Sequence, residues 1–526
     1  MIRAVEIMDR DRSYSTKILI SGFIFFSLIF NFYPSLHYSQ KITLIHSNDT
    51  HGVYKPIRIK VNNSLRLVGG MKAANHYLNI LQKNEKNMIL IDVGDIMTGT
   101  WAAQMEYRGA VGGAMVEFLN LLNYDIWVPG NHDFDQGQSN IKKLLTLAEP
   151  EVINANIIYQ DSGRLFFEKP YSIIERAGLK IGLIAVMEEN FLIEVKREAT
   201  RNLDVLPILP TLRQYVHQVD QKTDLIIVLV HARFEAGREI ARNIPDIDVV
   251  LVASEDGRFE EINGVLVKST YGHQRTLGYL SLEVKDDRVE CYHQDLIWLW
   301  ADQEISSSSE ISDLVAKVDE SVKKDFLNSI GYAEFDITRE GGPVESPMGN
   351  LVTDAMCWKT GAQIGFQNSR GIRADIFAGP ITLADVYHVT PFRNILIKFN
   401  LTGQQIKDAL EYDIEKGYDR LQVSGLTYEY YSKALKPFGS RIKTISVNGE
   451  DLVREGRVLC AEKEYTVVSN DYVVGHAKDK YFGFIIKRQR NTQESLVRTL
   501  SDYIKKLRIL KIGYEDRIVA VNKLNH

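Results

Sequence analysis

Cysteine is scarce in this sequence, with only Cys291, Cys357 and Cys460 among 526 residues. The three are far apart and form no C-x-x-C pair of the kind that holds zinc. They allow at most one disulfide. The sequence therefore excludes a disulfide-rich scaffold and a cysteine metal cluster, and it leaves the redox compartment open.

An excess of charge is also lacking. The chain has 63 Lys and Arg against 68 Asp and Glu, for a net charge of −5. Nothing in this balance favours nucleic acid or a basic membrane surface, so we expect no nucleic-acid partner. Internal repeats are absent too. An apolar content of 45% is typical of globular proteins, and the length allows two or more domains.

Long apolar runs are missing except near the N-terminus. Residues 18–30 read "ILISGFIFFSLIF" and follow Lys17. This run is shorter than the roughly 20 residues of a spanning helix and is typical of the core of a secretory signal. We predict a signal peptide or N-terminal anchor at 1–40, and a periplasmic, secreted or cell-surface location. Membrane attachment through an uncleaved segment stays open.

Continuous apolar runs after the leader predict buried strands. They occupy residues 42–46, 87–92, 125–128, 180–187, 224–230 and 248–254. Because these runs do not alternate with polar residues, both faces of each strand should be buried. Helix-like spacing at 69–84, and in stretches between several strands, predicts a layered α/β arrangement with two covered faces.

A charged, Ser-rich stretch then separates this region from a second one. Ser306–Ser309 followed by Glu310 is typical of a helix start, with Ile311, Leu314, Val315 and Val318 on one apolar face. Beyond it, strands such as "AQIGFQ", "ILIKF" and "YTVVS" mix with helices at 345–360 and 402–416. The predicted domains are 41–300, a linker helix at 301–328, a second domain at 329–510 and a tail at 511–526.

Polar side chains follow one predicted strand after another. They are Asp49, His51, Asp95, Asn131, His132, His231, Ser254 and Asp256. Sites in open α/β sheets form outside the carboxyl ends of strands. Carboxylate, imidazole and amide together suit Zn²⁺, Mn²⁺ or iron better than Mg²⁺ alone. Asp95 could bridge two cations, and such a pair lowers the pKa of water and holds a phosphoryl group.

The stretch "VPGNHDFDQG" at 128–137 adds a second chemical element. His132 is adjacent to the candidate ligand Asn131 and should face the substrate. Asp135 could orient that imidazole and hold it protonated.

Taken in order, these motifs resemble the 5′-nucleotidase family of the calcineurin-like metallophosphoesterases. That family also contains UDP-sugar hydrolases and cyclic-nucleotide phosphodiesterases. The later stretches "ESPMGNLVTDAM", "NSRGIR", "TPFRN" and "LTGQQIKDALE" are similar to its nucleotide-specificity domain. The resemblance covers roughly residues 41–490 and implies a four-layer αββα sandwich followed by a second α/β domain.

The resemblance also implies roles for single residues. Asp49, His51 and Asp95 would bind one metal ion, and Asp95, Asn131 and His231 the other. His132 and Asp135 match the catalytic dyad. In the second domain Phe392 and Tyr472 would sandwich the base, because aromatic faces stack on any base. Asn368, Arg373 and Asp479 would hydrogen-bond the sugar or base.

The motif after the last strand departs from the family pattern. Where the family has Gly-His-x-His or Gly-His-x-Gln, this chain reads Ala253-Ser254-Glu255-Asp256. We expect Asp256 to replace a ligand of the first metal and Ser254 to weaken the second site. Glu255 is expected to point away.

Two departures lie in the second domain. Arg370 stands where Gly is usual in the family and would place a positive charge in the pocket. Lys478 and Lys480 replace glycines of the loop near Asp479, which puts the nucleoside contact of Asp479 in doubt and would favour a more anionic or differently shaped substrate.

The function that the resemblance implies is hydrolysis of 5′-nucleotides by an exported enzyme with a metal-activated hydroxide. Two divalent cations, Mn²⁺ or Zn²⁺, would be its cofactors and a nucleotide its partner. Two alternatives stay open: a UDP-sugar or cyclic-nucleotide phosphodiesterase using the same site, and a degenerate member that only binds a nucleotide or a host partner. The sequence leaves the oligomeric state open.

Overall fold

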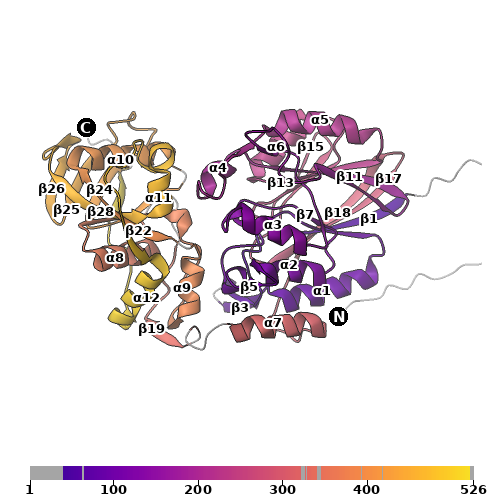
Figure 1. Cartoon of the computed structure of the whole chain (residues 1–526), viewed down its shortest axis with the longest axis horizontal. Coiled ribbons are helices and arrows are strands. Elements are labelled where there is room, and N and C mark those ends of the chain that lie inside the picture. The colour runs from indigo at the N-terminus through magenta and orange to yellow at the C-terminus, as the bar shows by residue number, and fades with distance from the viewer. Residues whose placement is uncertain are drawn as a thin grey trace, which may run out of the picture. The chain divides into compact units, whose positions relative to one another are not determined.

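The computed structural model describes residues 39–61, 64–321, 326, 328–339, 345–392, 394–417 and 419–521. They belong to one compact unit that begins at Ser39, and Figure 1 shows the arrangement of its elements. The predicted leader lies outside the described residues. Within the described ranges, no helix is both long enough and apolar enough to cross a membrane.

The first sheet is built on the predicted strand 42–46, which is β1 (Gln40–Ser47). The sheet order is β18 (Arg288–Trp298), β17 (Thr276–Lys285), β1, β4 (Met88–Asp92), β7 (Ile126–Trp127) and β8 (Glu151–Val152). β1, β4, β7 and β8 are parallel, and β17 pairs antiparallel with β1. The parallel pairing brings the carboxyl ends of β1, β4 and β7 to the same edge.

The second sheet contains the other predicted strands. Its order is β10 (Tyr171–Arg176), β11 (Leu179–Met187), β13 (Leu225–His231), β14 (Val249–Val252), β16 (Val265–Lys268) and β15 (Phe259–Ile262). The four central strands are parallel, and antiparallel strands flank them. All seven residues of β13 are buried, as its continuous apolar run predicts.

Helices cover the outer faces of both sheets (Figure 1). An apolar core fills the space between the sheets, with Ile42 and Ile89 from the first and Leu183 and Ile227 from the second. Over the first sheet lie α1 (Met71–Asn84), α2 (Gly113–Leu121) and α7 (Ser309–Ser321), and over the second lie α5 (Ile208–Asp220) and α6 (Phe234–Asn243). The expected four-layer αββα sandwich is confirmed.

The predicted helix after Ser309 is present as α7, and its buried residues are the expected ones: Ile311, Leu314, Val315 and Val318. These side chains pack in the same core as α1 and α2. The helix therefore forms part of the layer over the first sheet.

The C-terminal half has its own sheets and cores. One sheet has the order β23 (Leu421–Ser424), β20 (Ile364–Asn368), β28 (Glu464–Asn470), β22 (Ile395–Thr402) and β29 (Arg490–Ser495). A second contains β27 (Arg457–Val458), β26 (Glu450–Arg454), β25 (Ile442–Val447), β24 (Leu426–Tyr431) and β31 (Ile518–Val521). A small third sheet joins β21 (Gly379–Thr382), β19 (Ser329–Ala333) and β30 (Ile509–Leu510).

In the part of this half that the structure describes, the helices that pack on these sheets are α8 (Pro347–Thr360), α9 (Leu383–Val389), α10 (Gly403–Lys416), α11 (Asp471–Gly475) and α12 (Leu496–Leu507). α8 begins where the Ser346 hydroxyl accepts a hydrogen bond from the Gly349 amide, and α10 begins at a capping box formed by Thr402 and Gln405. Both helices coincide with stretches predicted from the sequence.

The sequence predicts a tail at 511–526, whereas the structure adds part of it to a sheet. β31 pairs in parallel with β24, and Ile518 is buried in the C-terminal core. Arg517 anchors this strand through an ion pair of 2.8 Å with Asp354. The last strand of the fold therefore lies beyond the predicted domain boundary.

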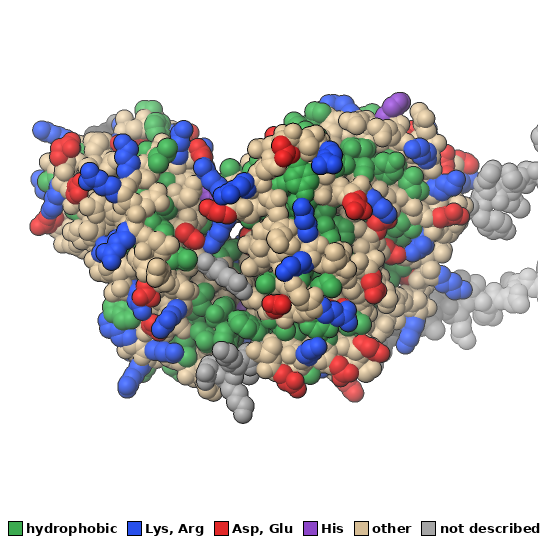
Figure 2. All heavy atoms as spheres, in the orientation of Figure 1, with side chains coloured by type: hydrophobic (Ala, Val, Ile, Leu, Met, Phe, Trp, Pro, Cys, Tyr) green, Lys and Arg blue, Asp and Glu red, His purple; other side chains and the backbone are tan. Residues whose placement is uncertain are grey.

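Charged side chains of both signs are interspersed over the face that Figure 2 shows, without a broad field of one sign. This surface agrees with the small net charge of the chain.

Candidate active site

The expected convergence of polar residues at strand ends is present. His231 ends β13, and its Nε2 lies 3.1 Å from Asn131 Oδ1 and 3.4 Å from Asp95 Oδ2. His51 Nε2 lies 3.7 Å from Asp49 Oδ1 and 4.0 Å from Asp95 Oδ2. Asp49, Asp95 and Asn131 follow β1, β4 and β7 of the first sheet, while His231 comes from the second. The cluster therefore joins the ends of both sheets.

The loops that carry the cluster have an unusual backbone. Asp49, His51 and Asp95 all adopt positive φ, at 50°, 48° and 59°. Such values are uncommon for residues with a Cβ and persist only where the surroundings impose them. Here the Asp49 amide donates to Gly94 O at 2.8 Å and the His51 amide to Asp95 O at 2.9 Å. The two loops therefore hold one another in this conformation.

Asp133 ties a third loop to the same place. Its buried carboxylate accepts hydrogen bonds from the backbone amides of Asp95, Met97 and Gly130, at 3.1, 3.0 and 2.7 Å. Burial and the charge of Asp95 raise the pKa of this carboxyl to about 7. Asp133 holds the loops together from behind the cluster.

The hydrogen bonds of His231 fix which nitrogen faces the cluster. Nδ1 donates to the carbonyl of Val93 at 2.8 Å, so Nε2 faces the oxygens of Asn131 and Asp95. Burial would lower the pKa of His231, but the charge of Asp95 outweighs it and raises the pKa to about 10. Ligand atoms that face one another in this way create a place for a cation.

His51 is oriented in the same manner. Its Nδ1 lies 3.3 Å from the carbonyl of Met97, which leaves Nε2 directed at the two carboxylates. Asp49, His51 and Asp95 each offer one ligand atom within 4.8 Å of the others, and all three are buried. Burial and the nearby charge of Glu255 raise the pKa of Asp49 to about 6. The donor set of carboxylates, imidazoles and an amide fits divalent transition-metal ions.

The backbone packs closely against the carboxylate of Asp95. A Cβ on Gly130 would overlap with Oδ1 of Asp95. The peptide therefore passes directly against the carboxylate, and the His132 amide donates to the same oxygen at 2.7 Å. This hydrogen bond fixes Asp95 between the two groups of candidate ligands.

His132 and Asp135 form the expected pair. His132 Nδ1 lies 2.9 Å from Asp135 Oδ2, and the Thr98 hydroxyl donates to that carboxylate at 2.7 Å. Burial alone would lower the pKa of His132, but the charges of Asp135 and Asp95 raise it to about 9. A protonated imidazole thus borders the cavity next to the cluster.

Most of the predicted substrate-binding residues line one cavity with this dyad. His132 and Asp135 share it with Asn368, Arg370, Arg373, Phe392 and Tyr472. The Phe392 ring lies 5.4 Å from that of His132, measured between centroids. Arg373 Nη2 lies 2.9 Å from His51 Nε2. The cavity therefore runs from aromatic side chains to the polar cluster.

Asp479 lies elsewhere than the sequence predicts. Its carboxylate forms an ion pair of 2.8 Å with Arg197 and does not line the cavity. Residues 477–481 form a π-helical turn that directs Lys480 inward instead. Lys480 Nζ donates to the Tyr472 hydroxyl at 2.8 Å.

Asp256 and Glu255 have exchanged the places expected for them. The Asp256 carboxylate pairs with Arg258 at 2.7 Å and accepts from the Ser269 hydroxyl at 2.9 Å. Glu255, expected to point away, brings Oε1 to 3.7 Å from His51 Nε2. Ser254 lines the same cavity as Glu255. The turn after β14 therefore presents Glu255, and not Asp256, to the cluster.

Sequence reasoning placed Glu255 wrongly and missed three residues: Asp133, His273 and Asp419. Asp419 is buried under the cavity, where it accepts from Asn368 Nδ2 at 3.2 Å, from the Arg370 amide at 2.7 Å and from the Tyr481 hydroxyl at 2.5 Å. Asp133 stands inside the quoted motif, but nothing in its spacing separates it from Asp135. His273 belongs to no motif and could be found only from the structure.

Comparison with known proteins agrees with this geometry. The family model for calcineurin-like phosphoesterases matches residues 42–265, and that for the 5′-nucleotidase C-terminal domain matches residues 328–484.

Among curated relatives, the NAD 5′-nucleotidase of Haemophilus influenzae is 25% identical over 86% of this chain and 87% of its own length. The 5′-nucleotidase of Rattus norvegicus is 26% identical over 91% and 90%. The crystal structure of a 5′-nucleotidase precursor from Thermus thermophilus superposes with a TM-score of 0.81 at 26% identity, over 92% of this chain and 100% of that one. This chain belongs to the 5′-nucleotidase family of the calcineurin-like metallophosphoesterases and is a metal-dependent phosphoric ester hydrolase.

Proposed function

We propose that this protein hydrolyses 5′-nucleotides to nucleoside and phosphate outside the cytoplasm. The observation that carries the proposal is one cavity with the His132–Asp135 pair at its polar end and Phe392 and Tyr472 among its walls. A cavity with polar groups at one end and aromatic rings among its walls matches a nucleotide, whose phosphate is polar and whose base is a flat ring. Export rests on the apolar run at 18–30 and its preceding Lys17.

Two divalent cations, Mn²⁺ or Zn²⁺, are the proposed cofactors. Asp49, His51 and Asp95 would hold one of them, and Asp95, Asn131 and His231 the other. Bound cations would lower the pKa of water and neutralise the phosphoryl oxygens. Because a serine hydroxyl is a poor ligand, Ser254 would leave the second cation more weakly bound.

The protein's own groups then orient the ester. His132 borders the cavity, and its Nδ1 is held by Asp135, so Nε2 is the nitrogen available to the leaving oxygen. The imidazole would stabilise charge or deliver a proton there. Arg370 and Arg373 line the same cavity and would bind the phosphate oxygens.

The aromatic walls would select the nucleoside. Phe392 and Tyr472 offer ring faces on which a base can stack. Asn368 would hydrogen-bond the sugar or base, and Asp419 holds its amide in place from below. The Asp479 carboxylate is engaged by Arg197 and takes no part in this proposal.

A second substrate class is favoured by one observation. Lys480 reaches the cavity through the π-helical turn, its Nζ 5.2 Å from the centroid of the Tyr472 ring, and Lys196 and Arg370 line the same cavity. Because Arg370 is assigned to the phosphate, Lys196 and Lys480 are the additional cations of this cavity, and they suit a substrate with a second anionic group. A UDP-sugar or a dinucleotide is such a substrate, and the NAD 5′-nucleotidase among the relatives acts on one by its name.

Phosphate release, together with chromatographic separation of the products, tests the proposal. Purified protein is assayed with AMP and other 5′-nucleotides, UDP-glucose and a 2′,3′-cyclic nucleotide, with Mn²⁺, Zn²⁺, Mg²⁺ and Co²⁺ added separately. We expect release from 5′-nucleotides. His132→Ala should lower AMP hydrolysis by about 10²- to 10⁴-fold, the usual contribution of a proton-transfer group, and leave metal content unchanged.

Full activity in His132→Ala would reject the role of that residue. Conversion of UDP-glucose to UMP and glucose 1-phosphate, or of the cyclic nucleotide to a nucleoside monophosphate, with 5′-nucleotides left intact, would favour a phosphodiesterase. No product from any substrate with any metal would point to the remaining alternative, a family member that only binds its ligand.

A further inference from the structure

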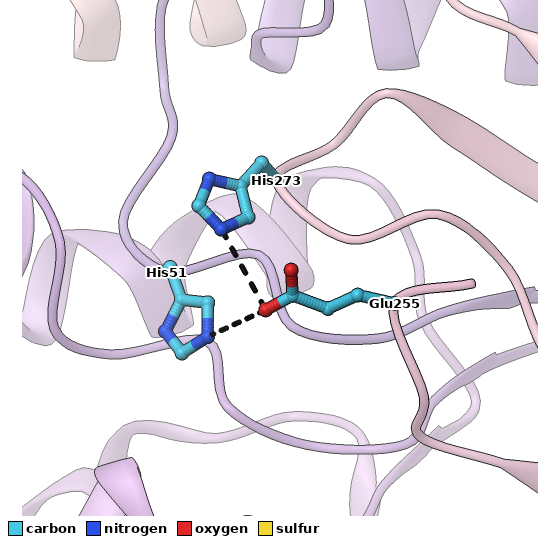
Figure 3. A group of neighbouring side chains, drawn as sticks. All are labelled: His51, Glu255 and His273. Atoms are coloured by element: carbon cyan, nitrogen blue, oxygen red, sulfur yellow. Dashed lines mark ion pairs between the residues drawn. The ribbon is translucent and has the colours of Figure 1, made fainter. Parts of the chain in front are cut away.

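The turn after β14 places a carboxylate between two imidazoles (Figure 3). Glu255 Oε1 lies 3.7 Å from His51 Nε2 and 3.7 Å from His273 Nε2. The three side chains come from separate parts of the chain: the loop after β1, the turn after β14 and the loop between β16 and β17. Their ligand atoms lie within 4.8 Å of one another.

The His273 loop is built to reach this position. The His273 amide donates to the carbonyl of Asp49 at 2.6 Å, and His273 adopts a φ of 61°. The preceding Gly272 lies so close that a Cβ there would meet Cβ of Asp49 and Cγ of Glu255, each at 2.9 Å. The positive φ of His273 and the close contacts of Gly272 together fix the backbone here. The backbone in turn fixes the position from which the His273 imidazole extends.

The surrounding charges favour a cation at this place. Three carboxylates, those of Asp49, Asp95 and Glu255, lie around His51 Nε2 at 3.7, 4.0 and 3.7 Å. Arg373 Nη2 stands among the same atoms, 2.9 Å from His51 Nε2 and 3.5 Å from Glu255 Oε1. The Arg373 guanidinium therefore already places positive charge at this point, where a divalent metal ion would place more charge in a more compact form.

Asp256, which the motif spacing predicts as a metal ligand, is held by contacts outside this site. Asp256 forms its ion pair with Arg258 and its hydrogen bond with Ser269, on the hairpin that follows. Turning it inward would break both contacts.

We propose that Glu255 and His273 are ligands of the first metal ion, together with His51, in place of the residue at position 256. The inference deepens the proposed function and rests on it for the presence of a metal pair. With two imidazoles and carboxylates, this site suits Zn²⁺ or Co²⁺ better than Mg²⁺ or Ca²⁺. The second site, with Ser254 beside it, holds its ion less tightly, so the two ions differ in affinity.

Metal binding by the full chain, measured without substrate, tests the inference. Wild type, Glu255→Gln, His273→Gln and the matched control Asp256→Asn are stripped with chelator, titrated with Zn²⁺ and passed through a desalting column, and bound zinc is counted by mass spectrometry. Titration with Co²⁺ reports the ligands through its absorption spectrum. We expect Glu255→Gln and His273→Gln each to weaken the tighter site at least tenfold and to change the Co²⁺ spectrum, while Asp256→Asn binds as wild type.

Wild-type affinity in Glu255→Gln and His273→Gln would overturn the inference, and so would loss of the tighter site in Asp256→Asn alone. Circular dichroism confirms that each variant is folded. If Glu255→Gln fails to fold, His273→Gln, whose side chain is 19% exposed, decides the result. Because no nucleotide is present, an error in the proposed substrate would leave the metal measurement unaffected.

Discussion

Asp133 and Asp135 stand two positions apart in one motif and have different surroundings. Asp135 contacts the imidazole of His132 and the hydroxyl of Thr98. Asp133 contacts backbone amides of three loop residues and is 1% exposed. One carboxylate therefore positions a side chain, and the other positions the loops.

Substitution by asparagine should separate these roles. Asp135→Asn removes the charge that orients His132, and we expect kcat for AMP to fall by about 10²-fold, within the range for proton-transfer groups. Metal content and melting temperature should stay near wild type. Asp133→Asn points an N–H group at backbone donors, and it should lower the free energy of unfolding by about 1–3 kcal/mol.

Kinetics, metal analysis and chemical denaturation of the two variants provide the check. A stable Asp133→Asn protein, or an Asp135→Asn protein that loses its metal, would show that the two roles are wrongly divided.

At the level of single residues, the sequence predicted the parts of the site that belong to short motifs. Asp49, His51, Asp95, Asn131 and His231 meet as expected because each lies at or just after the end of a strand whose carboxyl end faces the site. Glu255 and Asp256 could not be told apart, since the direction of a side chain in a turn depends on backbone angles and on partners such as Arg258. His273 depends on a long-range contact with Asp49, which no local pattern contains.

At the level of elements, the buried parallel strands were the most predictable. The run 225–230 is apolar without interruption, and β13 is buried along its whole length. The division of these strands between two sheets could not be predicted, because a buried run is equally compatible with either sheet. β31 was missed because "IVAV" is short and pairs with β24, about 90 residues away in the chain.

The pairing of β1 with β17 contains a close fit that can be tested. His46 lies opposite Gly278, is fully buried, and neither of its ring nitrogens has a hydrogen-bond partner within the described structure. A Cβ on Gly278 would overlap with the His46 ring. Gly278→Ala should therefore destabilise the protein by about 1–3 kcal/mol, the usual cost of overpacking. His46→Ala combined with Gly278→Ala should recover part of that loss, and chemical denaturation of the three variants measures the coupling.

The same histidine should contribute to the acid sensitivity of the fold. Burial lowers the pKa of His46 from 6.5 to about 3 in the folded protein. The unfolded chain therefore takes up a proton that the folded protein refuses, and stability present above pH 6.5 is lost as the pH falls toward 3. The loss approaches about 1.4 kcal/mol per pH unit. His46→Ala/Gly278→Ala should show a shallower decline of unfolding free energy between pH 6.5 and 4, and an unchanged slope would contradict the assignment.

At the level of the whole molecule, the cavity depends on both family segments. His132 comes from the segment that matches calcineurin-like phosphoesterases, and Phe392 and Tyr472 come from the segment that matches the 5′-nucleotidase C-terminal domain. We therefore expect the chemistry to depend on the first segment and substrate selection on the second. The departures Arg370 and Lys480 lie in the second segment, whereas Ser254 and Asp256 depart from the family pattern in the first, close to the candidate metal ligands.

A cation bound among the candidate metal ligands should also stabilise the whole fold. Loops from both sheets meet there, and the carboxylates of Asp49, Asp95 and Glu255 lie around one imidazole nitrogen. A cation that binds only the folded state at 100 times its dissociation constant adds about 2.7 kcal/mol. Removal of metal by EDTA should therefore lower the melting temperature by a few degrees, and Zn²⁺ or Mn²⁺ should restore it, whereas KCl at equal ionic strength should not. His132→Ala, which keeps the ligands, should show the same shift. A melting temperature that is indifferent to EDTA in both proteins would mean that the clustered acceptors hold no structural cation.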